Sequence, residues 1–125
     1  MVKRMPAHSK DESCPSCVVA GDFIFLAHHA GGGADVVSQM RAAFEGMKYT
    51  LSTVGATLDD MVQINLYLKN IDDFRGGARD VFFEYFTNGF PARMTTTTNF
   101  IEPSCLCQMD GIAYKCEHFS EEDLL

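Results

Sequence analysis

The chain has 125 residues, with ten Lys and Arg against seventeen Asp and Glu, and therefore a net charge of −7. This length supports one hydrophobic core but not two, so we predict a single domain spanning residues 1–125. The composition, 46% apolar and 22% charged residues, is ordinary for a globular protein. The negative charge argues against nucleic acid as the main partner, because a phosphate backbone requires a basic face.

Membrane insertion and secretion are not indicated by the sequence. No apolar run approaches the roughly 20 residues that span a bilayer, and no apolar segment follows the charged start at residues 1–6. Five cysteines are an odd number for a small secreted domain, where pairs are usual. We therefore expect a cytoplasmic protein without a membrane partner.

In the first half of the chain we predict an arm, a hairpin and a long helix. Residues 1–13 are polar and mixed in charge, which predicts a loose arm. Residues 17–27 are mainly apolar around a Gly-Asp turn, a pattern typical of two short paired strands. A long helix is predicted to begin at Ala34 or Asp35 and to end at Gly55. Its apolar face follows helical spacing and comprises Val36, Val37, Met40, Ala43, Phe44, Met47 and Leu51.

The second half predicts three strands and a second helix. Residues 61–68 alternate between apolar and polar, which indicates a strand with one buried face. A helix is expected over 74–86, weakened by a glycine pair in its first turn. Strands are expected at 93–100 and 106–115, and an acidic tail at 117–125. The order β-β-α-β-α-β-β predicts an α+β domain, a mixed sheet covered on one face by two helices. The predicted buried face of residues 61–68 comprises Val62, Ile64, Leu66 and Leu68.

The stretch Phe90-Pro91-Ala92-Arg93, followed by Met94 and four threonines, is the most informative part of the chain. Proline blocks helix continuation, and the β-branched run favours a strand. Arg93 would then lie at the mouth of that strand, where its guanidinium can bind a carboxylate through two parallel hydrogen bonds. The alternative for a lone arginine is a surface salt bridge.

Around Arg93, an ordered series of motifs covering about residues 18–114 resembles the Rid family of reactive intermediate deaminases, also called the YjgF or L-PSP endoribonuclease-like family. The matching motifs are Gly21-Asp22-Phe23-Ile24-Phe25-Leu26-Ala27, Leu51 to Val62, Ile71-Asp72-Asp73-Phe74, Phe82 to Phe86, Pro91-Ala92-Arg93 and Gly111-Ile112-Ala113. The resemblance implies a chorismate-mutase-like homotrimer, in which three sheets form a central barrel with clefts between subunits. It also implies hydrolysis of 2-imino acids to 2-keto acids and ammonia, with a small carboxylate metabolite as ligand and no cofactor.

The same resemblance assigns roles to individual residues. Arg93 takes the position of the arginine that binds the substrate carboxylate. Gln108 stands where the family has its water-activating glutamate; an amide can hold a water but cannot act as a general base, and a solvated strand residue is the alternative. Cys14 replaces a tyrosine that closes the pocket, and Thr95 a residue that is often cysteine. Arg79 replaces an asparagine, and a second arginine would suit a more negatively charged substrate.

His28 and His29 replace small and polar residues of the family near the expected cleft. Histidine titrates near neutral pH, so either side chain could replace the missing base; the alternative is a pair of surface histidines. Two cysteine pairs, Cys14 with Cys17 and Cys105 with Cys107, have the spacing of possible zinc ligands. Cys105 and Cys107 would share the side of a strand opposite Gln108, so we favour buried or incidental thiols and no metal.

Three functions follow from these observations. The first is an imine or enamine deaminase of the Rid type. The second is a non-catalytic trimer that binds a small carboxylate through Arg93, which the glutamine at position 108 favours. The third is the RNA cleavage or translation inhibition carried in the family's older name, against which the net charge of −7 speaks.

Overall fold

The computed structural model describes residues 1–116, so the acidic tail expected at 117–125 lies outside the described residues. Its strands are β1 (Val2–Arg4), β2 (Cys17–Ala20), β3 (Phe23–His29), β4 (Met61–Leu68), β5 (Ala92–Thr97) and β6 (Cys107–Tyr114). Its helical segments are α1 (Val36–Ser52), η1 (Leu58–Asp60), η2 (Phe74–Ala78) and α2 (Arg79–Tyr85).

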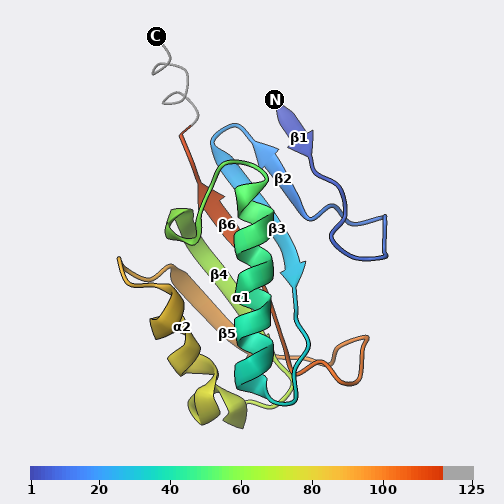
Figure 1. Ribbon diagram of the computed structural model, residues 1–125, viewed down its shortest axis with the longest axis vertical. Helices are drawn as coiled ribbons and strands as arrows, with labels where there is room; N and C mark the ends of the chain where they lie inside the picture. Colours follow the sequence, from blue (N-terminus) through green and yellow to red (C-terminus); the bar gives the residue numbers. More distant parts are fainter. Residues whose placement is uncertain (117–125) are drawn as a thin grey trace.

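One mixed sheet runs through the described residues in the order β1-β2-β3-β6-β4-β5. Strands β4 and β5 are parallel, and every other neighbouring pair is antiparallel. Both helices lie on one face of this sheet (Figure 1). The predicted α+β class, a mixed sheet with two helices on one side, is confirmed. We call the uncovered side of the sheet the open face.

Local chemistry explains where α1 begins. The Asp35 carboxylate accepts a hydrogen bond from the Ser38 backbone N–H at 2.8 Å. In return, the Asp35 backbone N–H donates to the Ser38 hydroxyl oxygen at 3.3 Å. This capping box satisfies two of the backbone groups that a helix end leaves unpaired. Gly55 follows the helix with a φ of 78°, a conformation that favours glycine. Both predicted ends are close to those observed.

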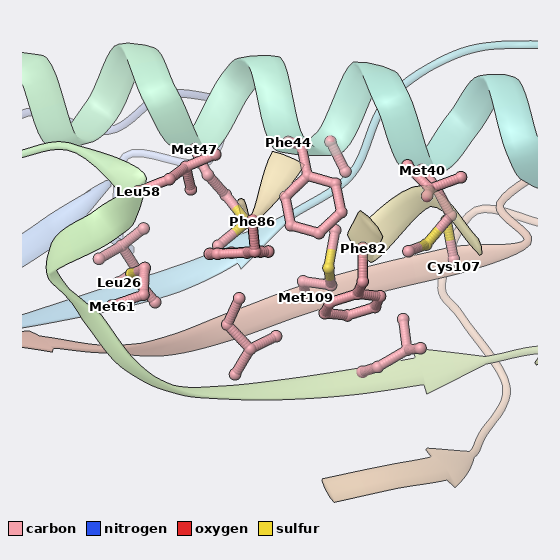
Figure 2. Packing of buried hydrophobic residues seen from close by; sticks show 14 of the residues in the cluster. Leu26, Met40, Phe44, Met47, Leu58, Met61, Phe82, Phe86, Cys107 and Met109 are labelled. Carbon is pink, nitrogen blue, oxygen red and sulfur yellow. The ribbon is translucent and has the colours of Figure 1, made fainter. Parts of the chain in front are cut away.

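The core lies between α1, α2 and the sheet. Figure 2 shows Phe44 projecting from α1 toward Phe82 and Met109, and all three side chains are buried. The Phe44 ring meets Phe82 edge-on, with 5.2 Å between centroids, and Phe86 with 5.6 Å. Such aromatic contacts stabilise a core beyond the area that they bury. Helices and sheet are therefore held in one arrangement, which determines the positions of the loops at the ends of the strands.

The expectation of a loose arm at residues 1–13 is wrong for β1. Val2 to Arg4 pair antiparallel with β2, and the Ser16 N–H donates to the Pro6 carbonyl at 3.0 Å. All three β1 side chains are exposed. The expectation rested on polar side chains, whereas this pairing uses backbone N–H and C=O groups. Every residue other than proline supplies both of these groups.

Val62 does not lie on the buried face of β4 as predicted; its side chain is 47% exposed. The register between β4 and β6 shifts between Met61 and Gln63, so Val62 occupies a bulge. A bulge inserts one unpaired residue and redirects the side chains around it. The other three predicted members of that face, Ile64, Leu66 and Leu68, are buried.

The second helix is broken where the glycine pair was expected to weaken it. Residues 74–78 form a π-helical turn, and Gly76 and Gly77 have non-helical dihedrals, with a φ of 130° at Gly77. A regular α-helix runs only over Arg79–Tyr85. Phe74 lies before the break and Phe82 after it, and both rings lie against Arg93 of β5.

Candidate functional site

Arg93 lies on β5, at the edge of the sheet, and its side chain lies on the helix-covered side. Its guanidinium carbon is 5.0 Å from the ring centroids of both Phe74 and Phe82. Its Nε donates a hydrogen bond to the Thr95 hydroxyl at 3.0 Å. Two aromatic faces and one hydroxyl therefore orient a cation, and none of the hydrogen bonds or ion pairs found within residues 1–116 uses its two terminal nitrogens.

Two further arginines lie close to Arg93. A cavity of about 280 Å³, which we call the arginine cavity, is lined by Ile71, Phe74, Arg75, Arg93 and Thr95. Burial lowers the pKa of Arg93, and the positive charge of Arg79 lowers it further, although a guanidinium stays charged at neutral pH. Arg79 itself is 4.0 Å from Asp80 and lies over the Phe83 ring. The arrangement concentrates positive charge around a small space in an acidic protein.

Gln108 lies on β6 and faces the opposite side of the sheet. It lines an open-face cavity of about 530 Å³, which we call the glutamine cavity, together with Asp110 of the same strand, His28 of β3 and Tyr67 of β4. Residues 96–101 complete the wall of this cavity. It also lines a second cavity of about 360 Å³ beside the glycine loop 30–33. Its Nε2 lies 3.7 Å from the Cys105 sulfur.

Asp110 was not among the site residues predicted from the sequence, although it lines the glutamine cavity. Its carboxylate accepts hydrogen bonds from the Asn65 Nδ2 at 2.8 Å and from the Tyr67 hydroxyl at 3.1 Å. These two residues lie on β4, where Asn65 is the direct cross-strand partner of Asp110 and Tyr67 that of Gln108. The available signal was strand periodicity, because residues 108 and 110 must face the same side of β6.

His28 and His29 occupy different environments. His28 is exposed and lines the glutamine cavity. His29 is 2% exposed; its Nε2 is hydrogen-bonded to the Thr50 hydroxyl of α1 at 2.8 Å, and its Nδ1 to the Ala27 carbonyl at 2.7 Å. Burial is the main cause that lowers the pKa of His29 to about 4. His29 is thus a neutral residue of the helix-covered core, away from both cavities.

Cys14 lines neither cavity; its thiol contacts the Pro15 carbonyl at 3.6 Å in the loop before β2. Cys105 and Cys107 are buried, as their spacing predicted, and burial raises the pKa of the Cys107 thiol to about 12. In the described part of the chain, no three His, Cys, Asp or Glu side chains gather as metal ligands. The same residues contain no helix long and apolar enough to cross a membrane.

Five of the predicted site residues therefore fall into two groups on opposite sides of the sheet, whereas His29 and Cys14 belong to neither group. Arg93 and Thr95, with Arg79 nearby, lie on the helix-covered side at the edge strand. Gln108 and His28 lie on the open face. One chain alone cannot place both groups around a single small substrate.

The family model described as endoribonuclease L-PSP matches residues 16–115. A RutC family protein of Pyrococcus abyssi is 35% identical over 81 residues, and the match covers 65% of this chain and 63% of that protein, just under two thirds of each. A Mycobacterium tuberculosis member of the YjgF/YER057c/UK114 family superposes with a TM-score of 0.85 at 25% identity, covering 91% of this chain and 99% of that one.

The chain belongs to the endoribonuclease L-PSP family, which is the Rid/YjgF family that its motifs resemble. Some relatives carry the name of an activity. A protein of Dermatophagoides farinae named 2-iminobutanoate/2-iminopropanoate deaminase is 37% identical over 57 residues, which cover 46% of this chain and 44% of that protein.

Proposed function

We propose that the protein hydrolyses small 2-imino acids to 2-keto acids and ammonia, with Arg93 binding the substrate carboxylate. The observation that carries this proposal is the arginine cavity. Its Arg93 makes none of the ion pairs found among the described residues, yet aromatic rings and a hydroxyl hold it in place. A guanidinium oriented in this way suits bidentate binding of a carboxylate. The deaminase name of the Dermatophagoides relative supports the same reaction.

A second copy of the chain is part of the proposal, because Arg93 and Gln108 lie on opposite sides of one sheet. We propose a homotrimer in which β5 of one subunit brings Arg93 to the glutamine cavity of the next. The position of β5 at the end of the sheet supports this, since an edge strand is accessible to a neighbour. The exposed aromatic side chains of the open face also support it.

Substrate preference and location are further parts of the proposal. Arg75 in the arginine cavity and Arg79 beside it favour a substrate with a second negative group. His28, which lines the glutamine cavity, is proposed to border the pocket, and Gln108 to hold a water by hydrogen bonds. No cofactor is proposed. Five unpaired cysteines support a reducing compartment, the cytoplasm.

The experiment that tests this function is imine hydrolysis in a coupled assay, where an amino-acid oxidase generates the 2-imino acid and its decay is followed. We expect wild type to accelerate decay and Arg93→Ala to lower kcat/KM by tenfold to a hundredfold or more, since a charge-assisted hydrogen bond contributes roughly 1.5–3 kcal/mol. Calorimetry with 2-ketobutyrate should show the corresponding loss of affinity. Arg4→Ala is the matched control, because Arg4 is an exposed arginine on β1.

Two results would contradict parts of the proposal. Unchanged 2-ketobutyrate binding by Arg93→Ala would refute the role of Arg93. No acceleration by wild type, combined with binding that depends on Arg93, would favour the second candidate, a non-catalytic carboxylate-binding protein. Gln108 is the observation behind that candidate, because an amide cannot take a proton from water. RNA cleavage would regain support only from RNA affinity that falls steeply with salt.

A further inference from the structure

We propose that Asp110 is the catalytic residue that takes the proton from the attacking water, a role that Gln108 cannot fill. This inference rests on the imine hydrolysis proposed above and names the base for it. Asp110 and Gln108 lie two residues apart on β6 and line the same glutamine cavity. A water held by the Gln108 amide would therefore lie near a carboxylate that can accept its proton.

The Asp110 carboxylate is held in place but not saturated. One oxygen accepts from Asn65 at 2.8 Å and the other from Tyr67 at 3.1 Å. An ionised carboxylate has about four acceptor sites, so each oxygen keeps capacity for a water. Both donors come from the adjacent strand β4, which gives the carboxylate a rigid support.

The sheet itself does not require a charge at position 110. Asp110 is half-buried, and none of the ion pairs among the described residues involves it. Its cross-strand partner Asn65 is neutral, and an amide at position 110 could form the same link. Partial burial of a carboxylate that has hydrogen bonds but no ion pair costs free energy that a neutral amide would not, so a chemical role explains its presence better than a structural one.

The step balances with Asp110 as the only proton carrier. The water oxygen bonds to the imine carbon while Asp110 takes one water proton and the C=N electron pair moves to nitrogen, which then receives that proton. The resulting carbinolamine passes its hydroxyl proton to nitrogen by the same route. The C–N bond then breaks, the C=O bond forms, and ammonia leaves. One water is consumed, and no oxidant or metal is needed.

The titratable groups that share the cavity with Asp110 are Tyr67 of β4 and His28 of β3. Burial raises the pKa of Tyr67, and the negative charge of Asp110 raises it further, so the phenol remains a donor at neutral pH. His28 is the competing candidate for the base. Replacing each of the two residues in turn shows which one turnover requires.

The test measures kcat, KM and 2-ketobutyrate affinity for wild type and Asp110→Asn, with Asp59→Asn as an exposed control on η1. We expect Asp110→Asn to lower kcat by about 10²- to 10⁴-fold, the usual contribution of a general base, with KM and affinity within about threefold because Arg93 is untouched. Asp110→Glu should recover part of kcat. Circular dichroism and molecular mass check that each variant folds and assembles.

The outcomes separate this inference from the proposed function. A wild type without turnover overturns both. Turnover retained by Asp110→Asn, or lost only in His28→Gln, overturns the inference and leaves the deaminase standing. If Asp110→Asn does not fold, Gln108→Glu decides between the two possibilities. A change in kcat below tenfold supports a base already present, whereas a rise of tenfold or more overturns the inference, because a carboxylate at position 108 was then what the site lacked.

Discussion

His28 and His29 show how strand alternation assigns different properties to adjacent residues of the same type. Successive side chains of β3 point to opposite sides of the sheet. His28 borders the glutamine cavity, whereas His29 packs beneath α1 between Thr50 and the ring of His8, whose centroid is 4.2 Å away. Only His28 can take part in surface chemistry, and His29 influences folding stability instead.

We predict that His29 makes the protein less stable in acid. Its pKa is about 4 in the folded chain against an ordinary 6.5, so the unfolded chain binds the proton first as pH falls. The contribution of His29 to the free energy of unfolding should be fully present above about pH 6.5 and fall by on the order of 3 kcal/mol between pH 6.5 and 4. Urea denaturation at pH 7.5 and 4.5 measures this loss.

His29→Gln should remove most of that dependence on pH, because glutamine does not titrate. His28→Gln is the matched control, an adjacent exposed histidine whose replacement should leave the pH dependence of stability in place. An unchanged pH dependence in His29→Gln would assign acid sensitivity to other groups.

The interrupted second helix positions the arginine cavity. Phe74 lies in the π-turn and Phe82 in α2, on the two sides of Gly77 with its positive φ. The ring centroids of both are 5.0 Å from the Arg93 guanidinium carbon. π-helical turns are frequent at functional sites, and this one supplies both Phe74 and Arg75 to the cavity.

We predict that Gly77→Ala lowers the free energy of unfolding by about 1–3 kcal/mol. Its φ of 130° disfavours any side chain, and a Cβ there would lie 2.5 Å from a methyl of Val37 on α1. Gly76→Ala is the matched control: its φ is −86° and no atom lies within 4 Å of a Cβ at that position. Gly76→Ala should be neutral or slightly stabilising. Equal effects of the two substitutions in thermal unfolding would contradict this account.

At the scale of the molecule, residues 1–116 leave the open face of the sheet without a covering helix. Side chains 43–44% exposed lie on it at Phe23, Phe25 and Tyr114, beside the glutamine cavity strands β3 and β6. Exposed aromatic groups gathered on one side of a sheet are typical of an interface between proteins. In the proposed homotrimer this face would be covered, and Arg93 of one copy would meet Asp110 of another.

We predict a mass of about 42 kDa in light scattering, three times the 13.9 kDa chain. Phe25→Glu should yield a folded monomer, because three carboxylates would be brought into the shared interface. The same variant should lose imine hydrolysis, since Arg93 and Gln108 of one chain lie on opposite sides of its sheet. Phe83→Glu, a comparable exposed phenylalanine on α2, should leave the mass unchanged. A wild-type monomer would refute the shared site.

Signals between near neighbours in the chain predicted much of the fold. The apolar spacing of residues 36–51 and the alternation within 61–68 correctly predicted α1 and β4, because burial follows the periods of helix and strand. The ordered motifs around Pro91-Ala92-Arg93 correctly indicated the family.

The tertiary structure alone determined which strands pair and which side chains come into contact. Pairing between β4 and β6 produced the bulge at Val62 and brought Asn65 and Tyr67 to Asp110, across more than 40 residues of chain. It also placed Arg93 and Gln108 on opposite sides of the sheet. Local periodicity specifies which residues of a strand share a face, but the register and the neighbouring strand arise from contacts between distant segments, which no short window of sequence contains.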